Sequence, residues 1–176
     1  MFVFPTLLGG IAWLIGGRPL TFDLIRRAVA ARYPDLRGIG TAELAPRLDG
    51  AERPVLLDAR TEAEYAVSHL RGARRIDPAH PALDPLSDVP KTAAIVVYCS
   101  VGYRSASVAG WLTEQGFRNV RNLEGGLFRW ANEGRRMCQG ERRVTQVHPY
   151  DRTWGLLLEP AHRANATPVK GSWPVP

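Results

Sequence analysis

The sequence predicts an α/β domain in which a cysteine follows a buried strand. The apolar run Ala93–Tyr98 ends at Cys99, and a helical pattern from Ser105 to Gln115 follows a short loop that contains Gly102. A short apolar run before a loop is typical of a strand that is buried on both faces. Strand and helix patterns alternate on either side of this unit, which is typical of α/β folds. The 176 residues are enough for one such domain with extensions.

The first elements along the chain are predicted to be helices. Thr21 can cap a helix that ends near Arg32, because apolar residues recur between them at helical spacing. Thr41 begins a second, short helix that ends at Leu48. The uncharged stretch Phe2–Gly17 lacks the basic start and cleavage site of a secretory signal, and it is shorter than the about 20 residues of a membrane-spanning helix. We expect this stretch to pack on the domain or on a partner rather than to contact a membrane.

A short strand and a capped helix come next. Pro54–Asp58 is predicted to be a buried strand. Thr61 and Glu64 have the spacing of a capping box, in which each residue's side chain bonds the backbone of the other, so a helix is expected from Glu62 to about Ser68.

Asp58 and Arg60 lie at the turn between these two elements. The carboxyl edge of a parallel sheet is where open α/β folds bind ligands, so both side chains are candidates for supporting a site. The alternative is a structural ion pair that only shapes the turn. Residues 72–76 are predicted to form another short strand, and the proline-rich stretch 77–90 leaves room for only a brief helix.

The pattern after the Cys99 unit predicts one more strand and one more helix. The strand is expected over residues 117–122, and the helix from Leu127 to about Glu133 with Trp130 as a core anchor. Residues 142–147 are predicted to form an edge strand. The apolar stretch 148–158 has to pack on the domain or present a binding surface. Residues 160–176 are expected to be a loose end.

The Cys99 loop carries the chemistry. It has the form Cys-x4-Arg and ends at Arg104, at the start of the helix. Backbone N–H groups converge at such a junction and favour negative charge, and the thiolate is the reactive form of cysteine. A cysteine phosphatase uses a loop with five intervening residues; the shorter loop here suits a single sulfur atom on Cys99 better than a phosphate. Candidate residues for the loop that would bind a substrate are Ser100, Val101, Gly102, Tyr103 and Arg104.

Three stretches in order resemble the rhodanese-like sulfurtransferase family, over roughly residues 40–137. They are the segment Val55–Ala73, the Cys99 loop and the segment Val120–Trp130. The resemblance implies a doubly wound parallel sheet flanked by helices, with the cysteine loop at its carboxyl edge. It also places Asp58 near that loop. The chain would then consist of an N-terminal extension over 1–39, a rhodanese-like domain over 40–137 and a C-terminal extension over 138–176.

The resemblance further implies that Cys99 takes a sulfane sulfur from a donor such as thiosulfate and passes it, through a persulfide, to cyanide or a thiol. No metal or organic cofactor is implied. The second position of the loop is often basic in thiosulfate-using members, whereas here it is Ser100, so the loop has less positive charge with which to hold thiosulfate. A cysteine phosphatase or arsenate reductase is one alternative. Another is a non-catalytic or carrier module that docks a partner protein, with a protein as sulfur acceptor.

Composition limits the partners and the compartment. The net charge of +6 comes from scattered arginines without a nucleic-acid motif, which favours a solvated basic surface over nucleic-acid binding and would attract a small anionic donor. The two cysteines, Cys99 and Cys138, make neither a disulfide framework nor a metal site, and a reactive thiol favours the reducing cytoplasm. Cys138 is a bystander or a resolving thiol. His69 and His80 are interpreted as structural, because the family uses no histidine base.

Overall fold

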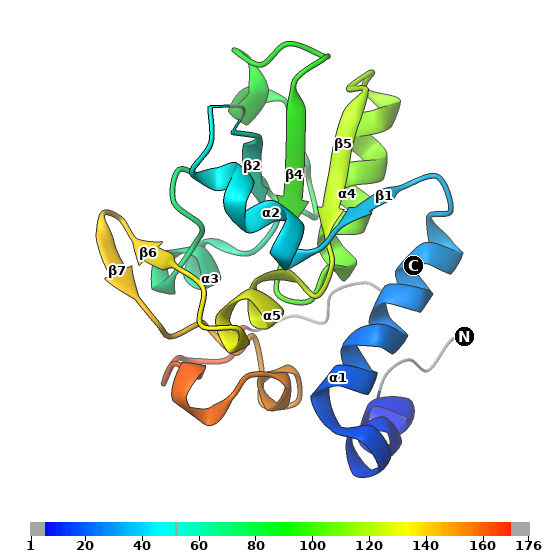
Figure 1. Cartoon of the computed structure of the whole chain (residues 1–176), viewed down its shortest axis with the longest axis vertical. Helices are drawn as coiled ribbons and strands as arrows, with labels where there is room; N and C mark the ends of the chain where they lie inside the picture. Colours follow the sequence, from blue (N-terminus) through cyan, green and yellow to red (C-terminus); the bar gives the residue numbers. More distant parts are fainter. Residues whose placement is uncertain (1–5, 52, 170–176) are drawn as a thin grey trace.

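The computed structural model describes residues 6–51 and 53–169 and contains a five-stranded parallel sheet with helices on both faces (Figure 1). The sheet has the order β1-β5-β4-β2-β3. Its strands are β1 (Arg37–Ile39), β2 (Val55–Asp58), β3 (Arg74–Arg75), β4 (Ala94–Tyr98) and β5 (Asn119–Leu123). The predicted α/β fold with a doubly wound parallel sheet is confirmed.

Alternation along the central strand explains why both faces of the sheet are covered. Val96 and Tyr98 of β4 belong to one core cluster, and Ile95 and Val97 to the other. Successive side chains of a strand point to opposite faces, so an all-apolar strand needs a helix layer on each side. The first layer is supplied by α2 (Thr41–Leu48) and α5 (Gly126–Asn132), and the second by α4 (Tyr103–Glu114).

The capping box forms as predicted. In α3 (Glu62–Val67) the Thr61 side chain accepts a hydrogen bond from the Glu64 backbone, and the Glu64 carboxylate accepts one from the Thr61 backbone at 3.0 Å. The proline-rich connection contains one short 3-10 helix, η1 (Asp84–Leu86). Its brevity agrees with the prediction, because proline removes the N–H groups that a longer helix needs.

The first helix differs from its predicted start. Helix α1 (Thr6–Arg32) runs through Thr21 rather than beginning there, and it is kinked at Gly17, whose backbone angles are φ 66° and ψ −161°. Pro19 stands in the first turn after the kink, a position that tolerates proline because its missing N–H has no helical partner there. The Thr21 hydroxyl therefore donates to the Gly17 carbonyl at 3.3 Å instead of capping the helix.

The expected packing of residues 2–17 depends on residues 1–5, which lie outside the described chain, and on side chains that the structure does not describe. Among the described helices, none combines the length and the apolar character needed to cross a membrane.

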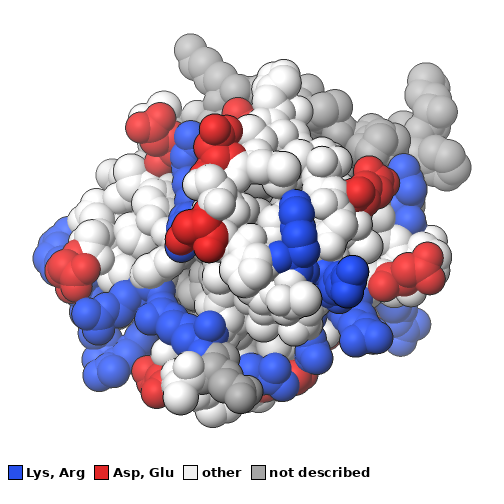
Figure 2. Space-filling model, turned by 90° about the horizontal axis from the view of Figure 1, so that it is seen from above, with Lys and Arg blue, Asp and Glu red and all other residues white. Residues whose placement is uncertain are grey.

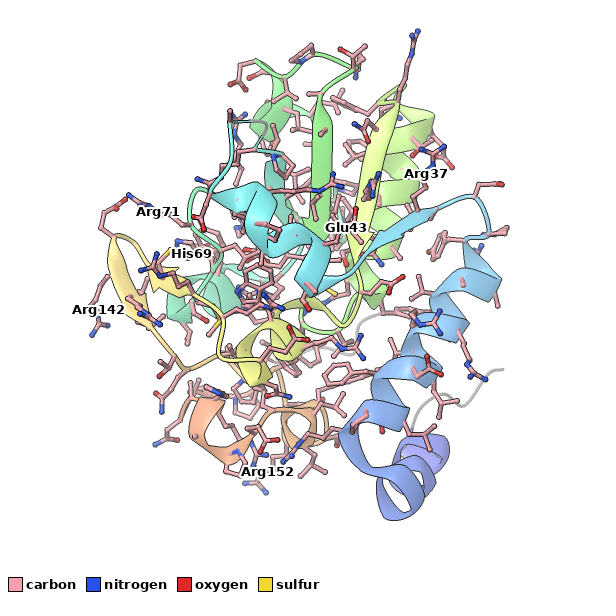
Figure 3. The ribbon with its side chains drawn as sticks, in the orientation of Figure 1. Arg37, Glu43, His69, Arg71, Arg142 and Arg152 are labelled. Atoms are coloured by element: carbon pink, nitrogen blue, oxygen red, sulfur yellow. The ribbon has the colours of Figure 1, made fainter. Side chains whose placement is uncertain are left out.

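The strand predicted over residues 142–147 is present over a shorter range and lies outside the main sheet. Residues Arg142–Val144 form β7, which pairs antiparallel with β6 (Met137–Gln139) as a separate hairpin. The hairpin meets the rest of the domain through a bridge between His69 and Cys138, and Figure 3 shows His69, Arg71 and Arg142 on this side of the molecule. Strand β1 was missed because its sequence, Arg-Gly-Ile, has no apolar run.

The chain beyond the hairpin lies against the domain. Val147, Leu157 and Leu158 are buried in the same core cluster as α5, and Asn132 of α5 donates to the Leu157 carbonyl at 2.7 Å. Residues 160–169 also make backbone hydrogen bonds, for instance Ala164 N–H to the Val147 carbonyl at 3.0 Å, so this part is not the loose end that the sequence suggested. The expected loose end over 170–176 lies outside the described residues. The boundaries at 39/40 and 137/138 remain predictions.

Positive charge is distributed over the surface rather than gathered in one place. Figure 2 shows the molecule from the side of the strand beginnings, with arginine and lysine side chains in several separate groups and acidic side chains between them. Figure 3 labels Arg37 of β1 and Glu43 of α2, two elements that are adjacent along the chain. Glu43 forms an ion pair with Arg121 at 2.9 Å. Such mixed surfaces have a weaker field than the net charge suggests.

Candidate active site

Cys99 lies in the tight turn between β4 and α4. Gly102, the residue before α4, has φ 96° and ψ 1°, a left-handed conformation that glycine adopts without a Cβ clash. The turn brings the Gly102 N–H to 3.2 Å from Cys99 Sγ. The sulfur is therefore held at the amino end of a 12-residue helix, where unpaired N–H groups and the helix dipole favour negative charge.

The start of α5 fixes the backbone of this turn. The Leu127 N–H donates to the Cys99 carbonyl at 2.8 Å, and the Phe128 N–H donates to the Ser100 carbonyl at 2.9 Å. Gly126 comes so close that a Cβ on it would lie 2.3 Å from the Cys99 carbonyl oxygen. Because a residue with a Cβ would clash at this distance, Gly126 is a packing requirement of the cysteine turn.

The end of β5 holds the other side of the turn. Asn122 donates from Nδ2 to the Gly102 carbonyl at 2.8 Å, and its Oδ1 accepts from the Ser105 hydroxyl at 2.7 Å. Both side chains are buried. Since buried polar groups keep their hydrogen bonds, these contacts fix Gly102 and the first turn of α4 relative to the sheet.

Arg104 forms a buried ion pair with Glu64 of α3. Its Nη1 lies 2.8 Å from Oε2 and its Nη2 lies 2.6 Å from Oε1, a bidentate arrangement. Ser100 completes the network: its hydroxyl donates to Glu64 Oε1 at 2.8 Å and accepts from Arg104 Nη2 at 2.8 Å. The network joins both ends of the cysteine turn to α3, so Glu64 holds the turn in place.

Burial and pairing act in opposite directions on these two groups. Burial raises the pKa of Glu64, but the hydrogen bonds and charge of Arg104 outweigh it and lower that pKa to about 2. Burial likewise opposes the charge on Arg104, and Glu64 outweighs it, so the pKa of Arg104 lies above its usual value. Both groups are therefore charged at neutral pH.

Asp58 and Arg60 form a second buried pair. Arg60 Nε lies 2.8 Å from Asp58 Oδ1 and Nη2 lies 2.7 Å from Oδ2, and neither side chain is exposed to solvent. Arg60 also donates to the Ser68 carbonyl and lies over the Tyr98 ring. Asp58 lies beside Tyr98 of β4, the residue before Cys99, so it is close to the loop. The ion pair with an arginine, which the sequence analysis considered for these two residues, is present, and no described hydrogen bond joins either side chain to the backbone of the Cys99 loop.

None of the described interactions joins the other candidate residues, Val101 and Tyr103, to the Cys99 sulfur. Val101 is buried and lines a small hollow against α1, together with Ile25 and Val29, and Tyr103 packs against the core. Cys138 is buried in the hairpin with its Sγ 3.5 Å from the His69 carbonyl, and burial raises its thiol pKa. No group of histidine, cysteine and acidic side chains with metal-binding geometry occurs in the described chain.

Sequence reasoning missed three residues that shape the site. Glu64 was recognised only as part of a capping box, and Asn122 and Ser105 only as parts of a strand and a helix. A glutamate in a capping box uses one carboxylate for the helix start, and here the same carboxylate also binds Arg104. Nothing in the local sequence signals this, since Glu64 and Arg104 are forty positions apart.

Fold and site define an α/β domain with a buried cysteine in a Cys-x4-Arg turn at the carboxyl edge of a parallel sheet. The family description "Rhodanese-like domain" matches residues 41–133, which is more than half of the chain, and the chain belongs to this family.

Named relatives extend this result. A protein of Allochromatium vinosum named "Sulfurtransferase" is 36% identical over 96 residues, which cover 54% of this chain and 89% of that protein. A "tRNA uridine(34) hydroxylase" of Staphylococcus epidermidis is 31% identical over 121 residues, covering 58% of this chain but only 36% of the relative. The crystal structure of a thiosulfate sulfurtransferase from Pseudomonas aeruginosa matches with a TM-score of 0.53 and 26% identity, over 60% of this chain and 20% of that one. The chain thus has sulfurtransferase homologues and spans about a third of its hydroxylase-named relative.

Proposed function

We propose that this protein is a sulfurtransferase in which Cys99 carries the transferred sulfur as a persulfide. The observation that carries the proposal is the contact between the Gly102 N–H and Cys99 Sγ at 3.2 Å, inside a turn whose arginine is already paired. Membership of the rhodanese-like family and the relative named "Sulfurtransferase" support the same reaction.

The first half-reaction breaks one sulfur–sulfur bond and forms another. The Cys99 thiolate attacks the outer sulfur of thiosulfate, the bond between the two thiosulfate sulfurs breaks, and sulfite leaves with the bonding electrons. The enzyme then holds a persulfide whose terminal sulfur is anionic. Backbone N–H groups of residues 100–104 and the start of α4 stabilise that charge, in the way that oxyanion holes stabilise developing charge.

The second half-reaction returns the free thiolate. Cyanide attacks the terminal sulfur and leaves as thiocyanate, or a thiolate attacks and leaves as a persulfide. In both cases the electrons of the broken bond return to Cys99. Neither half-reaction consumes an oxidant or a cofactor, and the proposed participants are a small anionic donor, a thiol or cyanide, and, as a carrier variant, a protein acceptor.

Two features support sulfur chemistry over phosphoryl transfer. The turn has one residue fewer than a cysteine phosphatase loop, so its circle of N–H groups is smaller. In addition, the Arg104 guanidinium binds Glu64 through both Nη atoms and Ser100 through Nη2. An arginine engaged in this way does not offer the free fork that a phosphate dianion needs.

Donor preference and compartment are part of the proposal. Ser100 turns its hydroxyl toward Glu64, so the second loop position adds no positive charge for thiosulfate. We expect weak binding of thiosulfate, with the overall charge of +6 drawing in the anion. A thiol that must cycle between thiolate and persulfide favours the reducing cytoplasm.

The test is intact-mass spectrometry after incubation with thiosulfate. We expect the native chain to gain one sulfur atom that cyanide removes, and Cys99→Ala to gain none. Cys138→Ala is the matched control, because it removes the other cysteine and leaves the turn intact; it is expected to load like the native chain. A gain retained in Cys99→Ala would overturn the assignment of the carrier. No gain from thiosulfate, polysulfide or a persulfide donor would overturn the function.

A further inference from the structure

Tyr150 reaches the cysteine turn from outside the part of the chain that matches the family. The family match ends at residue 133, and Tyr150 belongs to the irregular segment that follows the β6–β7 hairpin. In Figure 1 this segment lies below α5, on the side of the sheet toward which β4 points, and Figure 3 shows Arg152 on its outer side. It is thus placed at the edge of the sheet where Cys99 lies.

The Tyr150 ring covers the Arg104 guanidinium. The centre of the guanidinium lies 4.9 Å from the ring centroid, a cation–π distance. The nitrogens of the same guanidinium bind Glu64 and Ser100. Arg104 is therefore held by the carboxylate and hydroxyl at its nitrogens and by an aromatic ring over its face.

The backbone at Tyr150 is held in an unfavourable conformation. Its φ is 66°, and it is the only non-glycine residue with a positive φ in the described chain. Such a conformation is costly for a bulky residue and persists only where the surroundings impose it. Here the Tyr150 N–H donates to His148 Nδ1 at 3.0 Å, and the Tyr150 carbonyl accepts from the Val169 N–H at 2.8 Å.

A neighbouring glycine supports the same conformation. Gly155 approaches Pro149 so closely that a Cβ on Gly155 would lie 2.8 Å from the proline Cβ. The chain on both sides of Tyr150 is thus held in place, and from this position its ring lies over Arg104.

The turn beneath the ring is almost closed to solvent. Cys99 is 1% exposed, Ser100 is 4% exposed and Arg104 is 7% exposed. A persulfide needs an acceptor to reach its terminal sulfur, so the side chains packed around the turn decide which acceptors react. Tyr150 is one of them, because its ring lies over Arg104 at the end of the turn.

We propose that Tyr150 is a specificity-determining residue of the Cys99 site, where its ring restricts the opening to donors and acceptors of small size. The proposal builds on the sulfurtransferase function by naming the substrate class, which is small anions and small thiols rather than bulky thiols.

The first experiment measures access to Cys99 without sulfur transfer. Alkylation of Cys99 by iodoacetamide and by the bulkier N-phenylmaleimide is followed by peptide mass, so that Cys138 does not contribute. Tyr150→Leu is expected to raise the ratio of the maleimide rate to the iodoacetamide rate by about tenfold. Tyr150→Phe keeps the ring over Arg104 and is expected to leave the ratio unchanged.

Two further variants serve as controls. Tyr33→Leu removes a different cation–π contact, in which the centre of the Arg32 guanidinium lies 5.2 Å from the Tyr33 ring centroid. This variant is expected to leave the ratio of the two alkylation rates unchanged. Tyr150→Gly removes the ring and accepts the left-handed backbone, so it replaces Tyr150→Leu if that variant does not fold. An unchanged ratio in the folded Leu or Gly variant overturns the proposal, as does a raised ratio in Tyr33→Leu.

The second experiment measures persulfide discharge by cyanide and by glutathione. The ratio of the glutathione rate to the cyanide rate is expected to rise in Tyr150→Leu and to stay unchanged in Tyr150→Phe. If the native chain loads no sulfur, the sulfurtransferase function fails, and the alkylation ratio still decides the role of Tyr150. If loading occurs and both ratios are unaffected by removal of the ring, only the proposal for Tyr150 fails.

Discussion

Two buried arginine–carboxylate pairs lie on either side of the turn after β2, and they differ in what they connect. Asp58 and Arg60 are two positions apart and close on each other, whereas Glu64 and Arg104 are forty positions apart and join α3 to the cysteine turn. The first pair leaves one nitrogen, Arg60 Nη1, without a partner among the described residues. In the second pair both Nη atoms bond to the protein.

Burial and ion pairing are therefore not enough to identify a functional residue. Both pairs are hidden from solvent and both stabilise charge, but only the Glu64–Arg104 pair contacts residues of the Cys99 loop. Breaking either pair leaves a buried charge without its partner, so both are expected to matter for stability. Only the second is expected to matter for sulfur transfer.

The largest effect is expected for Glu64→Ala. The change removes the partner of Arg104, Ser100 and the Thr61 backbone at once, at a cost of roughly 3–5 kcal/mol in the free energy of unfolding. Because the turn loses its tie to α3, the rate of sulfur loading on Cys99 falls roughly 100-fold. Urea unfolding and the initial rate of mass gain with thiosulfate measure the two effects. A loading rate equal to that of the native chain, in a variant of reduced stability, would show that the pair is structural only.

The matching change in the other pair separates stability from transfer. Arg60→Met removes the partner of a fully buried carboxylate and is expected to cost roughly 3 kcal/mol of unfolding free energy. The loading rate per folded molecule stays at the native level, because Arg60 does not contact the Cys99 loop. Adding Asp58→Leu removes the stranded charge, and we expect this double variant to regain most of the lost stability. A loading defect in Arg60→Met would erase the distinction between the pairs.

The acid side of the stability curve tests Glu64 directly. Its pKa falls from 4.5 to about 2 on folding, so the unfolded chain binds the proton more readily and stability rises with pH between these values. The contribution is fully present above pH 4.5 and is lost as the pH falls toward 2, with a total of about 3 kcal/mol. The free energy of unfolding measured from pH 6 to pH 2 should drop more steeply in the native chain than in Glu64→Gln. Parallel curves for the two proteins would contradict this assignment.

The smallest effect is expected for Thr61→Ala. This change removes the capping side chain of α3 and costs about 1 kcal/mol of unfolding free energy. The Thr61 backbone and Arg104 still hold the Glu64 carboxylate, so sulfur loading remains at the native rate. Thermal unfolding and the loading assay measure the two quantities together. A large loss of loading would mean that the helix cap, rather than Arg104, positions Glu64.

Local signals in the sequence predicted most of the fold. The apolar run before Cys99, the Thr61–Glu64 capping box and the glycine after β4 act within a few residues, and the structure contains the strand, the capped helix and the turn that they predict. Strand β1 was missed because three residues without an apolar run leave no periodic signal. The start of α1 was misplaced because Thr21 is of a residue type that caps helices, whereas in the structure its hydroxyl donates to the Gly17 carbonyl.

The supporting residues of the site were harder to predict because their contacts are long-range. Cys99 is identified by the residues around it, whereas Glu64, Asn122 and Tyr150 reach the turn from three other segments. A carboxylate in a capping box or an asparagine at a strand end has many local explanations. Only the paired register of β4 and β5 and the path of the chain after the hairpin bring these side chains to one place.

The two amide contacts from α5 have a consequence for how such a protein can change its substrate. Leu127 and Phe128 hold the carbonyls of Cys99 and Ser100 through their own main chain, so these two contacts do not depend on the side chains at Val101 and Tyr103. Under the proposed function, substitutions at those two positions would change the surroundings of the turn while its main-chain anchors stay in place. Val101 and Tyr103 are thus the loop positions at which the sequence can vary without touching the Glu64–Arg104 network.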